Sequence, residues 1–265
     1  MLIVETLDRV RRITLDRPEA RNAVNPALAR MLYQAMRDAD TDAGVDAVVL
    51  SGGAAFCAGF DLKSAATGDG ATWIAGLAIP PEWDDPVNHP LPGPMGPSRL
   101  MLSKPVIAAI EGAAVAGGME LALWADVRIM AEDALFGVFC RRWGVPLIDG
   151  GTVRLPRIVG QGRANDLILS GRPVHAPEAQ TIGLADRVVA PGGALTAALA
   201  YAVALTRFPQ GCLRADFLSA RPAPGVLAAA LRREWASAGM VLAEGVAGAA
   251  RFAAGHGRGG RFDDL

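Results

Sequence analysis

The sequence predicts an α/β fold, and two observations support this prediction. First, short apolar runs, most of them ending in glycine, alternate with stretches of helical periodicity between residues 9 and 131. Second, the chain has 265 residues, of which 51% are hydrophobic. A chain of this length and composition can form the hydrophobic core of one large domain, with or without a smaller appendage.

The N-terminal elements are predicted from alternation and capping. Residues 9–18, RVRRITLDRP, alternate in the manner of a strand. Asn25 is a suitable N-cap and Pro26 suits the first helical position, so a helix is expected to begin there. The spacing predicts that one stripe of this helix is buried. Its members would be Leu28, Met31, Leu32, Ala35 and Met36.

Three apolar runs follow that are typical of buried strands. They are DAVVLSGG (46–53), KPVIAAIEG (104–112) and VRIMA (127–131). Between the second and third lies VAGGMELALWADV (115–127), in which two glycines precede an apolar helix. The succession of strand, helix and strand at short intervals is the pattern of an α/β fold.

Residues 64–103 interrupt this pattern, because they are dense in proline and glycine. A connection of this length inside a compact domain is usually functional or disordered. The segment also contains Trp73 and Trp83, which favour an ordered flap over a linker.

From residue 193 onward the sequence is rich in alanine, has helical periodicity and shows no strand pattern. We therefore divide the chain into a core of residues 1–192 and a helical region of residues 193–265. The apolar faces of these helices are broader than a lone surface helix needs. They pack either on another subunit or on the core of the same chain, and periodicity alone does not decide between the two.

Composition excludes several classes of function. The formal net charge of −1 offers no basic face for nucleic acid. No apolar run is long enough for a membrane span, and the N-terminus lacks the apolar core of a signal peptide. Scattered histidines argue against a metal site. The cysteines, Cys57, Cys140 and Cys212, are odd in number and lack CxxC spacing, which favours a reducing cytoplasm.

Two glycine-bearing loops are candidates for binding negative charge. In AGGMEL the glycines Gly117 and Gly118 stand at a helix start, where backbone N–H groups have no helical partner. The loop AFCAGFDLK (55–63) also follows an apolar strand. The structural alternative is that the glycines only turn the chain, and that Glu120 only complements the helix dipole.

These stretches resemble the enoyl-CoA hydratase/isomerase family, also called the crotonase superfamily. The resemblance rests on AFCAGFDLK, on residues 104–137 and on residues 150–189, and it includes RNAV at residues 21–24. It covers roughly residues 3–190 in order. The family is strongly indicated, whereas the reaction is not, because this fold hosts several chemistries.

The resemblance implies a spiral of ββα units with a C-terminal helical trimerisation region, assembled as a homotrimer or a dimer of trimers. It implies an acyl-CoA thioester as substrate, with no cofactor other than the coenzyme A that the substrate carries. Two backbone N–H groups, those of Phe60 and Gly117, would hold the thioester oxygen as it becomes an oxyanion. The matched segments place the residues that bind coenzyme A at Arg21, Ala58, Asp61, Leu62 and Gly118.

Hydratases of this family use two glutamates, and this sequence matches only one of them. Glu120 occupies the first place. In the segment FGVFCRRWGVPLIDGGT (136–152) the second glutamate falls on Cys140. Either Arg141 and Arg142 lower the pKa of that thiol, or it is an ordinary buried thiol. Asp149 is the other candidate acid, although aspartate before two glycines is also common in turns.

The sequence therefore supports three functional hypotheses. The first is an enoyl-CoA hydratase with Glu120 as the main acid and base. The second is another reaction of the family that needs one carboxylate: double-bond isomerisation, thioester hydrolysis or decarboxylation. The third is a non-catalytic protein that binds CoA thioesters. A serine hydrolase is disfavoured, because no GxSxG motif is present.

Overall fold

The computed structural model describes residues 1–66 and 68–257. Within these ranges the main sheet has six strands in the order β1-β2-β3-β4-β6-β9. Only β1 is antiparallel to its neighbour, and the other pairs are parallel. The bounds are β1 Leu2–Leu7, β2 Val10–Leu15, β3 Ala47–Ser51, β4 Val106–Ile110, β6 Val127–Ala131 and β9 Arg187–Val189. The expected strands at 9–18, 46–53, 104–112 and 127–131 are thereby confirmed.

A second, smaller sheet stands beside the first and was not predicted. It consists of β5 (Ala113–Val115), β7 (Leu135–Gly137) and β8 (Pro173–His175). The chain passes from β5 into helix α4 (Gly117–Trp124) through Ala116, whose φ of 53° is rare for a residue with a side chain. The Ala116 N–H donates to Gly137 O at 2.8 Å, which fixes this turn against β7.

Helix α1 (Pro26–Thr41) begins as predicted, because Asn25 Oδ1 accepts a hydrogen bond from the Leu28 N–H at 2.9 Å. Four of the five residues expected in its buried stripe are buried, but Met31 is 38% exposed. At 100° per residue, Met31 lies about 100° around the helix from the centre of the stripe. The prediction for Met31 was therefore wrong.

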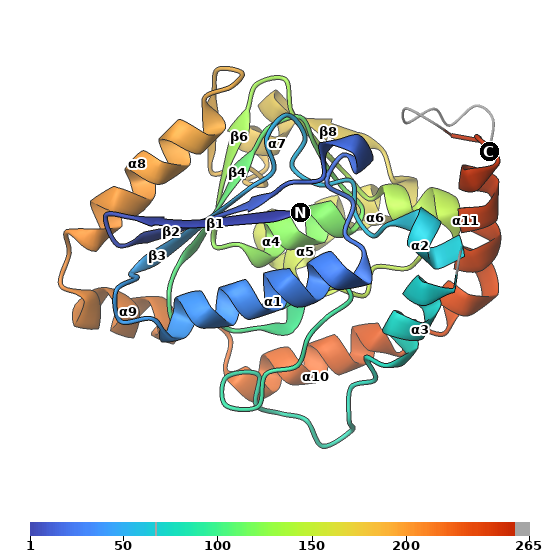
Figure 1. The fold of residues 1–265 in the computed structure, drawn as a ribbon, viewed down its shortest axis with the longest axis horizontal. Helices are drawn as coiled ribbons and strands as arrows, with labels where there is room; N and C mark the ends of the chain where they lie inside the picture. The colour runs from blue at the N-terminus through green and yellow to red at the C-terminus, as the bar shows by residue number, and fades with distance from the viewer. Residues whose placement is uncertain (67, 258–265) are drawn as a thin grey trace.

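The C-terminal region is helical, as expected. Helix α8 (Ala194–Thr206) packs on the main sheet of its own chain through Ala194, Ala198 and Ala202, which face Val49 and Ile107. Helix α8 therefore packs on the core of its own chain, and Figure 1 shows the helix alongside the strands. Packing of the helical region on another subunit stays a prediction. The remaining helices are α5 Gly151–Val159, α6 Gln161–Ser170, α7 Ala176–Thr181, α8 Ala194–Thr206, α9 Gln210–Ser219, α10 Pro224–Trp235 and α11 Val246–Ala253, with single turns η1 Pro18–Ala20, η3 Phe139–Trp143 and η4 Val241–Gly245.

The segment rich in proline and glycine is anchored by its aromatic side chains. Helix α2 (Leu62–Ala66) leads into this segment, which contains α3 (Asp69–Ala75) and η2 (Pro97–Arg99). The indole of Trp73 donates to Pro94 O at 3.1 Å, and that of Trp83 donates to His89 O at 2.6 Å. Trp83 also packs against Leu227 and Leu231 of α10. These contacts agree with the ordered flap that the tryptophans indicate.

The division of the chain between residues 192 and 193 stays a prediction, and the last part of the helical region, residues 258–265, lies outside the described residues. None of the helices in residues 1–66 and 68–257 combines the length and the apolar character that crossing a membrane requires.

Candidate active site

Helix α4 is buried along its whole length, and its first turn packs against the loop at residues 57–60. The Cys57 N–H donates to Ala113 O, and the Val115 N–H donates back to Cys57 O, both at 3.0 Å. A side chain at Gly118 would overlap the Cys57 carbonyl oxygen. Glycine at position 118 therefore permits the contact between α4 and this loop.

The two glycine-bearing loops meet at Gly59 and Gly117. A Cβ atom added at Gly59 would lie 3.0 Å from the Gly117 nitrogen and 2.9 Å from the Ala116 Cβ, and Gly59 has a φ of 96°. Within the described part of the chain, neither the Phe60 N–H nor the Gly117 N–H donates to another residue. The structure thus places the loops that carry these two N–H groups in contact, and it leaves both N–H groups without a hydrogen-bond acceptor in the described part of the chain.

Glu120 lies in the first turn of α4 and is 3% exposed. Its Oε1 accepts hydrogen bonds from the N–H groups of Asp149 and Gly151, both at 2.9 Å. Its Oε2 has no hydrogen-bond partner among the described residues. Burial, followed by the charges of Asp149 and Glu234, raises the pKa of Glu120 well above its ordinary value. A carboxyl group whose pKa is raised in this way is a candidate for both accepting and returning a proton.

Cys140 lies in the turn η3 and is buried. Burial, and to a smaller extent the charge of Glu120, raises the pKa of its thiol to about 12. Arg141 acts in the opposite direction but more weakly, and its guanidinium donates to Ile168 O. The hypothesis that neighbouring arginines lower this pKa was therefore wrong, because desolvation outweighs their charge. The structure agrees with the alternative of a buried neutral thiol.

Asp149 is also buried, and its carboxylate accepts hydrogen bonds from a neighbouring turn. Its Oδ1 accepts from the Met95 N–H at 2.9 Å and from the Ser98 hydroxyl. Burial raises the pKa of Asp149, although these hydrogen bonds oppose that shift. The turn carries Met95, which is fully buried, to the glycine loop: a Cβ at Gly117 would lie 2.6 Å from the Met95 Sδ. Asp149 thus anchors a segment of the flap to the site.

The residues expected to bind coenzyme A lie along the first loop. The Ala58 N–H donates to Arg21 O at 3.0 Å, and the Arg21 side chain is exposed. Asp61 forms an ion pair with Arg17 at 3.1 Å and caps α2, which begins at Leu62, through the Lys63 N–H. The carboxylate of Asp61 is therefore engaged within the protein. Gly118 adjoins the same loop from α4.

Several residues that the sequence did not indicate reach this centre from other parts of the chain. Glu234 of α10 accepts hydrogen bonds from the Gly150 and Thr152 N–H groups, and Arg154 donates to Asp149 O and Ser98 O. A signal for Glu234 did exist: it continues the buried stripe of Leu227 and Leu231 at helical spacing. A carboxylate on a buried stripe requires partners.

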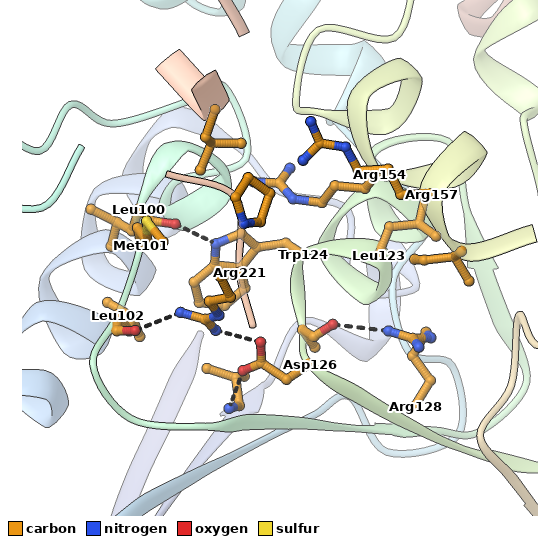
Figure 2. Close-up of a pocket in the computed structure, with 15 residues that line it drawn as sticks. Leu100, Met101, Leu102, Leu123, Trp124, Asp126, Arg128, Arg154, Arg157 and Arg221 are labelled. Atoms are coloured by element: carbon orange, nitrogen blue, oxygen red, sulfur yellow. Dashed lines mark hydrogen bonds and ion pairs between the residues drawn. The ribbon is translucent and has the colours of Figure 1, made fainter. Parts of the chain in front are cut away.

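A separate cavity of ≈ 250 Å³ lies near the far end of α4 and does not include Glu120, Phe60 or Gly117 in its walls. Figure 2 shows Arg221 bridging Leu102 O and Asp126, and the Trp124 indole donating to Leu100 O. The polar groups of this cavity are thus largely engaged with one another. The unpartnered N–H groups and the free carboxyl oxygen, rather than this cavity, locate the candidate active site.

The chain is similar to several known proteins. A family model described as Enoyl-CoA hydratase/isomerase matches residues 5–87 and 98–215. An enoyl-CoA hydratase of Mycobacterium tuberculosis is 37% identical over 202 residues, which cover 73% of this chain and 70% of that protein. A probable enoyl-CoA hydratase of Rhizobium meliloti is 40% identical over 210 residues, covering 78% and 76%. A solved structure of a carnitinyl-CoA hydratase from Mycobacterium avium has a TM-score of 0.79 at 32% identity, covering 96% and 95%.

Proposed function

This chain belongs to the enoyl-CoA hydratase/isomerase family, and on that premise we propose that it is an enzyme that adds water reversibly to a 2-enoyl-CoA. The observation that carries the proposal is the arrangement of the Phe60 and Gly117 N–H groups beside the buried Glu120. Two free donors and one carboxyl with a raised pKa are what an enolate-forming reaction of a thioester needs.

In this mechanism the thioester oxygen binds between the Phe60 and Gly117 N–H groups. Negative charge gathers on that oxygen when a nucleophile adds to the conjugated double bond, and the two donors stabilise it. Each donor of this kind contributes roughly 2.7–4 kcal/mol in acyl-transfer enzymes. Because both donors belong to backbone fixed by β5 and by the 57–60 loop, they need no rearrangement during the reaction.

Glu120 performs both proton transfers. Its ionised Oε2 takes a proton from water, and the hydroxide adds to Cβ of the enoyl group to give the enolate. The carboxyl group, now protonated, then returns the proton to Cα, so the products are a 3-hydroxyacyl thioester and the original carboxylate. Oε1 stays bound to the Asp149 and Gly151 N–H groups throughout. The neutral Cys140 thiol takes no part, because its pKa of about 12 leaves it protonated.

We propose the following partners for the reaction. Arg21, Ala58, Asp61, Leu62 and Gly118 bind coenzyme A, largely through backbone groups, since the Asp61 carboxylate is paired with Arg17. No cofactor other than the coenzyme A of the substrate is required. We further propose assembly as a homotrimer or a dimer of trimers, and a location in the cytoplasm.

Cys140 keeps a second candidate open. Isomerisation, thioester hydrolysis and decarboxylation each need only one carboxylate, and the resemblance aligns Cys140 with the second glutamate of the hydratases. The available Phe60 and Gly117 donors weigh against a non-catalytic binding protein, because catalysis is the use for which such donors are oriented.

The test is a panel of 2-enoyl-, 3-enoyl- and saturated acyl-CoA esters, with each product followed by mass spectrometry. A water adduct of the 2-enoyl ester, absent with Glu120→Gln, supports hydration. Release of free coenzyme A would indicate a thioesterase. Tight binding of the esters without turnover would rule out the catalytic proposals. If the missing second carboxylate limits the rate, Cys140→Glu raises hydration activity.

A further inference from the structure

Two buried carboxylates hold one short stretch of backbone by alternate N–H groups. Within residues 149–152, the N–H groups of Asp149 and Gly151 donate to Oε1 of Glu120, both at 2.9 Å. The N–H groups of Gly150 and Thr152 donate to Glu234, at 2.6 and 2.8 Å. The Thr152 hydroxyl adds a third hydrogen bond to Glu234, at 2.7 Å. Every N–H group of this stretch is therefore satisfied by one of the two glutamates.

Glu234 reaches this backbone from a distant part of the chain. It lies on α10, beyond the residues that the family model matches, and is 7% exposed. Leu227 and Leu231 on the same face of α10 pack with Trp83 and Val153, so the helix is fixed against α5 and the flap. From this position the Glu234 side chain reaches the start of α5, where it binds Gly150 and Thr152.

The start of α5 depends on Glu234. Gly150 stands at the N-cap with a φ of 90° and provides no side chain to cap the helix. Without Glu234 the Gly150 and Thr152 N–H groups would be left without an acceptor, which is costly for buried groups. The backbone would then move to find other partners, and the intervening Asp149 and Gly151 N–H groups would move with it.

We propose that Glu234 is a positioning residue of the active site, which holds residues 149–152 so that their other two N–H groups orient Glu120. This inference rests on the proposed function of Glu120. Glu234 does not touch the substrate in this proposal. It acts through the backbone and, because it is an acid close to Glu120, through its charge.

The charge of Glu234 also favours the protonated form of Glu120 and so contributes to its raised pKa, after burial and Asp149. Other charged and titratable groups act on the same pair of glutamates. They are Asp149 and Arg154 at the start of α5, Arg99 of η2 and Cys140 of η3. Removing the Glu234 charge lowers the pKa of Glu120, so the ionised base is present at lower pH.

Two variants separate the effect of the Glu234 charge on Glu120 from the effect of its hydrogen bonds to the backbone. Glu234→Gln keeps the size of the side chain but removes the charge and one acceptor, whereas Glu234→Asp keeps the charge and shortens the reach. We expect both to lower kcat for hydration, by up to about 100-fold, with KM changed by less than about threefold. Only Glu234→Gln moves the acidic limb of the pH profile of kcat to lower pH. The matched control is Glu132→Gln, an exposed glutamate that should match the wild type.

A second readout does not require turnover. The melting temperatures of the wild type, Glu120→Gln, Glu234→Gln and the double variant form a cycle. We expect Glu120→Gln to raise the melting temperature less in the Glu234→Gln background, because the two carboxylates share one backbone segment and repel each other.

The two readouts keep the inference and the proposed function apart. A wild type that hydrates no ester refutes the proposed function, and the melting cycle then still decides the role of Glu234. Additive melting temperatures, or variants at Glu234 whose kcat and pH profile match those of Glu132→Gln, would overturn the inference.

Discussion

The Glu120 carboxyl is bound at one oxygen and unbound at the other. The two N–H donors to Oε1 fix its orientation, and burial beside two further acids keeps its pKa high. Burial also raises the pKa of the neighbouring Cys140 thiol, to about 12, so this thiol stays protonated at neutral pH. In the proposed mechanism, one carboxyl group therefore both accepts and returns the proton.

At Glu120, replacement by glutamine should abolish most of the hydration activity. The amide can still accept the Asp149 and Gly151 hydrogen bonds, but it cannot transfer a proton. General acid–base catalysis contributes typically 10²–10⁴-fold, so kcat should fall by about that factor, as measured with a 2-enoyl-CoA. Glu132→Gln, which changes net charge equally at an exposed site, should leave the rate unchanged.

The variant Cys140→Ala tests whether the Cys140 thiol takes part in the reaction. Because the pKa of about 12 keeps the thiol protonated, removing it should change kcat by less than about threefold and leave the pH profile in place. The cavity left behind should cost about 1 kcal/mol of unfolding free energy, measured by denaturant titration. A large loss of kcat with retained stability would assign the thiol a chemical role.

Among the helices and strands, the sequence predicts those whose bounds depend on neighbouring residues. The α1 start follows from Asn25 and Pro26. The β6 strand is predicted with its observed bounds, because its four apolar residues and Arg128 lie between Asp126 and Glu132. The strands β5, β7 and β8 have only three residues each, which is too short for alternation to be recognised. They exist because they pair with each other, and pairing between distant segments leaves no local pattern.

The contact between the two donor loops should be sensitive to a single methyl group. Gly59→Ala places a Cβ 2.9 Å from Ala116 and 3.0 Å from Gly117 N at a positive φ, so it separates the loops and strains the backbone. We expect kcat to fall by roughly 10²–10³-fold, as for the loss of one donor. Stability should fall by about 1–3 kcal/mol. Gly162→Ala, with nothing within 4 Å, is the matched control and should be harmless.

The turn that carries Met95 depends on an acceptor at Asp149 rather than on a charge there. Asp149→Asn keeps an oxygen for the Met95 N–H and the Ser98 hydroxyl, so it should retain most activity and stability. Asp149→Ala leaves both donors unsatisfied and should cost about 2–6 kcal/mol, at 1–3 kcal/mol per buried group. If Asp149→Asn lost activity as severely as Glu120→Gln, Asp149 would instead be a catalytic acid.

For the whole molecule, stability should depend on the ionisation of Glu120. Its folded pKa is raised above the ordinary 4.5, so the folded state binds this proton more tightly than the unfolded chain. Its contribution to stability is therefore greatest below the ordinary pKa and is lost as pH rises toward the folded pKa. Glu120→Gln should raise the melting temperature at neutral pH, and the difference from the wild type should disappear on acidification. A constant difference across pH would contradict the raised pKa.

The whole molecule also shows why sequence alone located only part of the site. Phe60, Gly117 and Glu120 lie within short motifs, so the sequence indicates them as candidates. It does not indicate Glu234, because that residue is 114 positions from Glu120 and reaches the site only through the packing of α10 on α5. Met95 was hidden in a segment that has no periodicity and no match to the family model.

The central claim is that Glu120 alone transfers the protons of hydration. The most direct test is the rate of water addition to one 2-enoyl-CoA by the wild type, Glu120→Gln and Cys140→Ala, each shown to be folded. The account predicts a water adduct with the wild type and with Cys140→Ala at similar rates, and almost none with Glu120→Gln. Hydration that survives in Glu120→Gln, or that disappears in Cys140→Ala, would contradict it.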